Sequence, residues 1–160
     1  GNISEEEMMK TFNNGIVVQP PPLTVGVTDL LDKFCEYTLP GTWQGAITLG
    51  TTLQLMRIGN TLFIMIPEAS TPGGTNNLAV FNTSFPVEFR PAATVGGSIP
   101  IWNNGDTLIG YFNLNSVGTL SVGIEAGLIP SIAMTNFSGS ANRTGMSDCT
   151  ISCRLLGTTP

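Results

Sequence analysis

Side chains that could carry out chemistry are few in this chain of 160 residues. It contains no histidine, which removes the commonest general base and the commonest neutral metal ligand. Without histidine, no serine, threonine or cysteine can be activated as in a Ser-His-Asp or Cys-His site. No glycine-rich phosphate loop is present, and a spatial pair of carboxylates is the one catalytic arrangement that the sequence leaves open. We therefore predict a protein that is not an enzyme and holds no cofactor.

Acidic residues offer two candidate cation sites, each with a simpler explanation. Asp29, Asp32 and Glu36 have helical spacing, which also fits the solvated face of a helix. Asp106 could donate oxygen ligands to calcium, but it is a single carboxylate in a turn where Asn, Gly and Asp serve the backbone. We expect no metal site.

The three cysteines, Cys35, Cys149 and Cys153, predict free thiols. Alternation over residues 149–155 indicates a strand, in which Cys149 and Cys153 lie about 13 Å apart, beyond the roughly 7 Å limit of a disulfide. Buried thiols that act as small hydrophobes explain all three, and they suit assembly in a reducing cytoplasm. The alternatives are a bridge from Cys35 to one of the others, or a metal site that lacks a fourth ligand.

Charge is scarce and predominantly acidic. Six basic residues, scattered along the chain, stand against eleven acidic ones, so nucleic acid is not an expected partner. No apolar run approaches the roughly 20 residues of a membrane-spanning helix. Only 11% of residues are charged, against roughly 25% in an ordinary soluble domain. We expect the chain to hide part of its surface against copies of itself, as a homo-oligomer.

Strand signals dominate from Trp43 onward. Asn104-Gly105, between alternating apolar runs, predicts a two-residue hairpin turn within a meander that runs from residue 82 to residue 125. The meander should open with a strand at residues 85–91. Strands are also expected at residues 42–49, 52–58 and 61–66, the last two joined by a tight turn. Residues 62–66 are all apolar, which indicates a strand covered on both faces, one by the core and the other by a three-fold axis.

The N-terminal part has a different composition. Ser4 and Glu7 form a capping-box pattern that predicts a short helix, and a run of prolines follows at residues 20–22. We interpret residues 1–22 as a stalk or linker, or as an arm that packs on a neighbouring subunit, and residues 23–160 as the head domain. A second short helix is expected over residues 28–37, ended by residues 39–41.

Loops rich in amide side chains are the candidate binding sites, because sites on β scaffolds usually lie on loops. An aromatic ring beside amides supplies a stacking surface together with donors and acceptors. The candidate receptor-binding residues are Trp102, Asn103, Asn104, Asp106, Asn76 and Asn77. The alternative is that Trp102 belongs to the core and the asparagines only form turns. A second loop, at residues 138–147, or a cleft between subunits is the other candidate location.

Several of these segments resemble the receptor-binding heads at the tips of phage tail fibres and related viral fibres. The resemblance covers roughly a third of the chain, with further similarity at two upstream segments. The matching segments are Glu88-Phe89-Arg90-Pro91, Ile99-Pro100-Ile101, Gly110-Tyr111-Phe112-Asn113-Leu114-Asn115 and Gly118-Thr119-Leu120-Ser121-Val122, with Gly41-Thr42-Trp43-Gln44-Gly45 and residues 57–64 upstream. Since Arg90 lies in one of these segments, we expect it to make an ion pair or to contact a backbone carbonyl.

The resemblance implies an all-β fold, an antiparallel β-sandwich of jelly-roll type, in a homotrimeric head on a short stalk. It further implies a virion protein of a fibre or tail tip, assembled in the host cytoplasm, that attaches the particle to a host-surface receptor such as a glycan. Two alternatives remain open. One is a structural capsid or decoration module of a virion, and the other is a lectin-like or C1q/tumour-necrosis-factor-like binding module.

Overall fold

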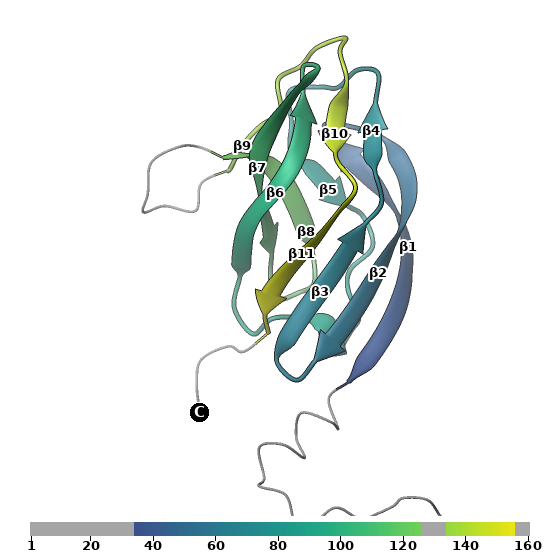
Figure 1. Ribbon diagram of the computed structural model, residues 1–160, viewed down its shortest axis with the longest axis vertical. Coiled ribbons are helices and arrows are strands. Elements are labelled where there is room, and N and C mark those ends of the chain that lie inside the picture. Colours follow the sequence, from purple (N-terminus) through teal and green to yellow (C-terminus); the bar gives the residue numbers. More distant parts are fainter. Residues whose placement is uncertain (1–33, 126–133, 156–160) are drawn as a thin grey trace, which may run out of the picture.

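The computed structural model of the chain describes residues 34–125 and 134–155 and shows an all-β fold. Eleven strands form one curled antiparallel sheet (Figure 1), with the strand order β11-β3-β2-β1-β5-β8-β7-β6-β10-β4 and with β9 paired to β8. The strands are β1 (Cys35–Gly45), β2 (Leu49–Ile58), β3 (Thr61–Ile66), β4 (Ala69–Thr71), β5 (Ala79–Phe81), β6 (Val95–Asn103), β7 (Asp106–Leu114), β8 (Leu120–Glu125), β9 (Met134–Thr135), β10 (Thr144–Met146) and β11 (Cys149–Arg154). The predicted all-β class is confirmed.

The sheet curls because the two ends of its strand order are linked along the chain. β11 pairs with β3 at one end, and β10 pairs with both β4 and β6 at the other. Only residues 67–68 separate β3 from β4, and only residues 147–148 separate β10 from β11. These four strands therefore form one long hairpin, with β11 beside β3 and β10 beside β4 (Figure 1), which joins the two ends of the strand order.

Two predicted hairpin turns are confirmed. Asn103 pairs with Asp106 across the turn Asn104-Gly105, where both central residues have positive φ, 55° and 89°. This is the requirement of a type I′ turn, which Asn and Gly meet with little strain. Ile58 pairs with Thr61 around Gly59, whose φ is 60°. The predicted strand at residues 42–49 is interrupted, because β1 ends at Gly45 and β2 begins at Leu49.

The helix predicted over residues 28–37 is wrong where the structure describes it. Cys35, Glu36 and Tyr37 form the start of β1 and pair with Arg57, Met56 and Leu55 of β2. The hydrogen bonds between β1 and β2 along most of β1 outweigh a local apolar spacing that predicts only one or two turns of helix. Pro40 does not end this element, because at that point β1 pairs only with β2 and a proline tolerates an unpaired side. Residues 28–33, with Asp29 and Asp32, lie outside the described residues, as do residues 1–22.

The strand predicted at residues 85–91 is also wrong. Val87–Phe89 form a short 3-10 helix, with Pro86 before it and Pro91 close behind. Two prolines so close together remove ladder donors and favour a turn. Arg90 Nε donates to the Phe85 carbonyl at 2.6 Å, which confirms the expected contact with a backbone carbonyl.

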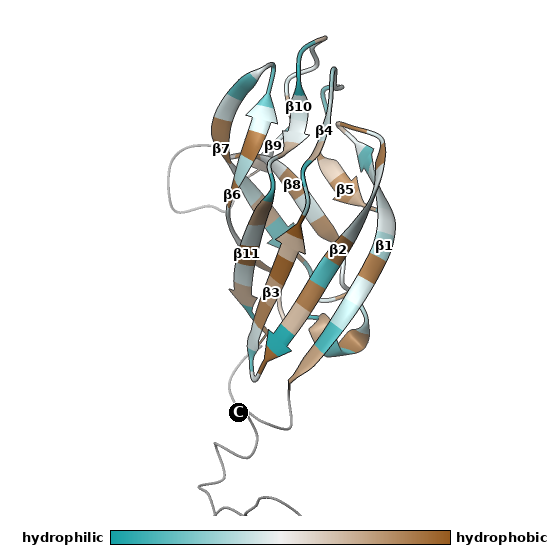
Figure 2. Cartoon of the chain, turned by 45° about the vertical axis from the view of Figure 1, so that its right-hand side comes forward, coloured by the Kyte–Doolittle hydropathy of each residue, from teal (hydrophilic) through white to brown (hydrophobic). Residues whose placement is uncertain are grey.

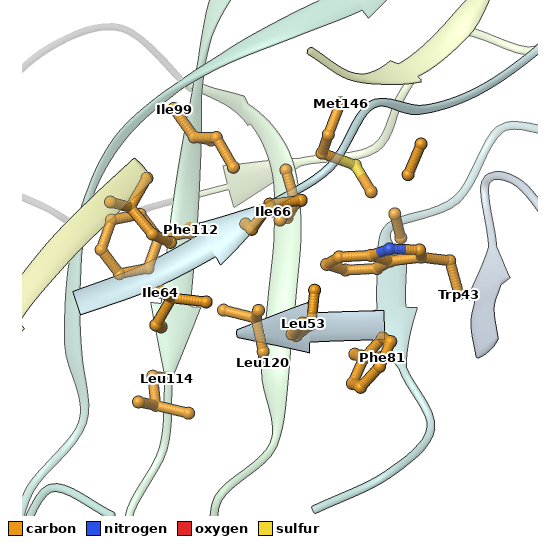
Figure 3. Packing of buried hydrophobic residues seen from close by; sticks show 14 of the residues in the cluster. Trp43, Leu53, Ile64, Ile66, Phe81, Ile99, Phe112, Leu114, Leu120 and Met146 are labelled. Atoms are coloured by element: carbon orange, nitrogen blue, oxygen red, sulfur yellow. The ribbon is translucent and has the colours of Figure 1, made fainter. Parts of the chain in front are cut away.

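The core lies inside the curl, where alternate residues of the strands meet. Figure 3 shows Trp43, Leu53, Ile64, Phe112 and other buried side chains gathered there, and Trp43 packs edge-on against Phe81 with ring centroids 5.1 Å apart. Figure 2 shows the matching alternation of hydrophobic and hydrophilic residues along β2. This pattern leaves the outer surface of the sheet and the loops at its ends as the places where a partner can bind.

Candidate functional site

The structure brings the two predicted amide-rich loops to one end of the sheet. Asn104 and Asp106 lie at the β6–β7 turn, and Asn76 and Asn77 lie in the loop between β4 and β5. The segment at residues 136–143 lies between them and bonds to both. Its Phe137 N–H donates to the Asn77 carbonyl at 2.9 Å, and its Ser138 N–H donates to Asn103 Oδ1 at 2.8 Å. We call this region, residues 72–77, 103–106 and 136–143, the loop end.

Further bonds tie the β6–β7 turn to the third segment. Asn142 Nδ2 donates to Asn104 Oδ1 at 2.9 Å, and the Gly105 N–H donates to the Arg143 carbonyl at 2.9 Å. Gly74 and Ser140 form a β bridge on the other side of the same segment. Sequence reasoning recognised this segment only as an alternative loop, because no local pattern indicates bonds to residues more than 30 positions away.

Asn103 is a positioning residue in this arrangement. Its side chain is 8% exposed, one of two buried polar side chains among the described residues. Besides accepting from the Ser138 N–H, it donates from Nδ2 to Ser138 Oγ at 3.1 Å. The oxygen and the nitrogen of the Asn103 amide thus both bond to Ser138, so Asn103 holds residues 136–143 in place. Asn104 and Asp106 face solvent.

Trp102 lies half-buried on the outer face of β6, and its surroundings were not predicted. Arg143 covers one face of the indole, with its guanidinium carbon 3.9 Å from the ring centroid, a cation–π contact. The same guanidinium forms an ion pair with Glu68 and donates from Nε to Ser70 Oγ at 3.1 Å. Trp102 is therefore neither a core residue nor a fully open stacking surface. Trp102 directly precedes Asn103 of the loop end, and the arginine and the carboxylate beside it are both partly exposed.

The exposed groups of the loop end are mainly amides and hydroxyls. Asn76, Asn104, Asp106 and Asn142 are exposed. A shallow hollow beside them is lined by residues 45–48, by residues of the segment 71–75 and by Ser140. Thr75 Oγ1 donates to the Gly45 carbonyl at 2.8 Å and fixes one wall of this hollow. Such a surface can bind a polyhydroxylated or peptide ligand through paired donors and acceptors, but it offers no activated nucleophile.

Metal and thiol chemistry find little support in the described residues. Within residues 34–125 and 134–155, no three acidic or cysteine side chains gather where they could hold a metal ion. Cys35, Cys149 and Cys153 are free. Burial raises the pKa of Cys149 and that of Cys153 from 9.0 to about 11, and the nearby Asp148 charge adds to the shift at Cys149. Both thiols therefore stay protonated and weakly nucleophilic at neutral pH.

Two comparisons with known proteins found no match. No protein-family model matches the chain, and no curated protein matches it significantly. In the part of the chain that the structure describes, no helix has the length and apolar character needed to cross a membrane.

Proposed function

We propose that this chain is the receptor-binding head of a viral or phage fibre and that it attaches the particle to a host-surface receptor without catalysis. In this proposal the curled sheet forms the antiparallel β-sandwich of a jelly roll, and three copies assemble as a homotrimer. The similarity of several segments to such heads and the low charge of the chain support it. The head is carried on the virion at a fibre or tail tip.

The observation that carries the proposal is the construction of the loop end. Side-chain bonds of Asn103 and Asn142 join residues 103–106 to residues 136–143, and backbone bonds join residues 136–143 to residues 72–77, while other amides beside them face solvent. If these loops served only to close the end of the sheet, their exposed amides would not need to be held in fixed positions by hydrogen bonds. Preorganised polar groups lower the entropy cost of binding a polar ligand. A glycan is the receptor class that best fits amides, hydroxyls and a half-buried indole ring.

Two double variants test this proposal. Asp106→Ala with Asn76→Ala removes a carboxylate and an amide that are both exposed at the loop end. Glu88→Ala with Ser116→Ala removes a carboxylate and a hydroxyl that are exposed at the opposite end and serves as the matched control. Asn103 is left unchanged because its side chain supports the fold. We expect binding to a glycan array and to host cells to fall about tenfold or more in the first variant, a loss of about 1.4 kcal/mol, and to be unchanged in the control.

The stability of both variants should stay within about 0.5 kcal/mol of the parent, as is usual for surface changes. Equal binding by the two variants would place the receptor site away from the loop end. Absence of binding by the parent protein to any glycan or host cell would contradict the attachment function and favour a structural module of a virion.

A further inference from the structure

One outer surface of the sheet carries an apolar centre that the fold itself does not cover. In β3, Leu62, Ile64 and Ile66 point into the core, whereas Phe63 and Met65 point outward and are half-buried. Figure 2 shows β3 hydrophobic along nearly its whole length, unlike its neighbour β2. The inward side of β3 is already fully apolar. On its outward side, polar residues would suit solvent better than two large apolar side chains, so this pair suggests that a partner covers it.

The strand register shows what surrounds this pair. Phe63 lies between Met56 of β2 and Ser152 of β11, and Met65 lies between Gln54 and Thr150. On the far side of β2, Met56 is next to Glu36 of β1, and a shallow groove passes beside Met65. Met56, Phe63 and Met65 thus form an apolar centre bordered by polar side chains on β1 and β11, an arrangement typical of a contact surface. We call the outward side of β1, β2, β3 and β11 the β3 face.

The two charges at the borders of the β3 face are opposite in sign. Glu36 lies on β1 at one edge, and Arg154 lies on β11 at the other edge. Both are exposed, and neither forms an ion pair within the described residues. Along the strands they differ by one two-residue step, about 7 Å, which their long side chains can span between molecules.

These positions match the geometry of a cyclic assembly. When copies turn the same face toward a shared axis that runs along the strands, the β1 edge of each copy meets the β11 edge of the next. Each contact then pairs Glu36 of one copy with Arg154 of its neighbour, and the apolar centres meet at the axis. Heterologous contacts of this kind close into rings, as a trimer requires.

We propose that the β3 face is the surface through which copies of this chain bind one another, with Met56, Phe63 and Met65 at the axis and a ring of Glu36–Arg154 pairs around it. The proposal rests on the trimer of the proposed function and specifies its contact surface. On the other large outer surface, Ile109, 59% exposed on β7, has the uncharged residues Pro100, Thr107 and Tyr111 as its neighbours on β6 and β7.

Mass measurement by light scattering at micromolar concentration tests the proposed surface in the full chain. Phe63→Glu places a carboxylate at the axis, where three copies would bring like charges together without water, so its mass should fall to one third of the parent value. Ile109→Glu, the matched control on the other outer surface, should keep the parent mass. Circular dichroism should show both variants folded, because both side chains are at least partly exposed in a single copy.

Charge reversal gives a second and independent test that does not touch the apolar centre. Glu36→Arg alone and Arg154→Glu alone should each raise the concentration at which the trimer dissociates by about tenfold. Because the dissociation constant of a trimer scales with the square of that concentration, this is a change of about 2.8 kcal/mol in the free energy of trimer formation. The double variant should restore the parent value.

The outcomes separate this proposal from the proposed function. A trimeric parent whose Phe63→Glu variant is also trimeric would overturn the β3 face as the contact surface and leave the trimer standing. Failure of the double charge reversal to restore assembly would overturn the Glu36–Arg154 pairing. A monomeric parent would overturn the trimer itself, whether or not the loop end binds a receptor.

Discussion

At both ends of the curled sheet, side chains hold irregular backbone in place by hydrogen bonds, but the two ends present different surfaces. At the loop end, the amide of Asn103 holds a distant segment, and asparagine side chains face solvent. At the opposite end, where β1 begins and β11 ends (Figure 1), the side chains of Arg57 and Arg90 hold backbone carbonyls. We call this second region the terminal end. The large apolar side chains exposed there are Phe34, Tyr37, Ile58, Val87 and Val117.

This difference indicates that exposed residue type, and not loop structure, distinguishes the two ends. Both ends contain irregular backbone that needs fixed hydrogen-bond partners, and at both ends a few side chains satisfy this need. At the loop end, the exposed groups are polar and can bind a ligand specifically through hydrogen bonds. The terminal end adds apolar groups, which favour contact with protein where the chain enters and leaves the domain. A head that binds at one end and is carried at the other would show this division.

Arg90→Met should cause the largest change, at the terminal end. The Arg90 guanidinium donates to the carbonyl of Phe85, a residue whose side chain is 0% exposed, so water cannot easily replace the donor. Loss of a hydrogen bond from a charged group to a buried acceptor should lower the free energy of unfolding by about 2–3 kcal/mol, measured by urea denaturation. Methionine keeps most of the aliphatic stem, so the change reports on the donor. A loss below about 0.5 kcal/mol would show that Arg90 does not hold the terminal end.

Asn103→Ala should cause a smaller loss, at the loop end. It removes two hydrogen bonds to Ser138, but Ser138 is exposed and its N–H can bond to water instead. We expect a decrease of about 1 kcal/mol in the free energy of unfolding. Hydrogen exchange should increase in residues 136–143 while the core strands stay protected. Asn76→Ala, at an exposed amide of the same end, is the control and should change stability by less than about 0.5 kcal/mol. A larger loss from Asn76→Ala than from Asn103→Ala would reverse the roles assigned to these two amides.

The sequence predicted those parts of the fold in which the deciding interactions are local. Asn104-Gly105 determines its turn by backbone conformation alone, and the alternation along β11 follows from the residues themselves. The helix prediction for Cys35–Tyr37 was wrong because it rested on the apolar spacing of residues 30, 31, 34 and 35, which matches a helical face. The strand state of Cys35–Tyr37 depends on β2, whose pairing with them no local pattern contains.

The candidate site was predictable in its residue types but not in its connections. Amide-rich turns indicated Asn76 and Asn104, yet the sequence did not indicate that residues 136–143 join their loops. Arg143 was missed for the same reason. Its contacts with Trp102 and Glu68 depend on β10 lying between β4 and β6, which is a property of the whole sheet.

Val87→Ser with Val117→Ser should cause the smallest change, again at the terminal end. The two valines are 69% and 60% exposed, so the folded chain loses little buried apolar area when they become polar. The free energy of unfolding should stay within about 0.5 kcal/mol of the parent value in urea denaturation. Val122→Ser is the matched control, because Val122 is 0% exposed and the same exchange there buries a hydroxyl in the core. A loss above about 1 kcal/mol from the double variant would show that the assembled protein covers these valines. The terminal end would then be a contact surface between copies of the chain. The two ends would differ because the terminal end is covered and the loop end is open.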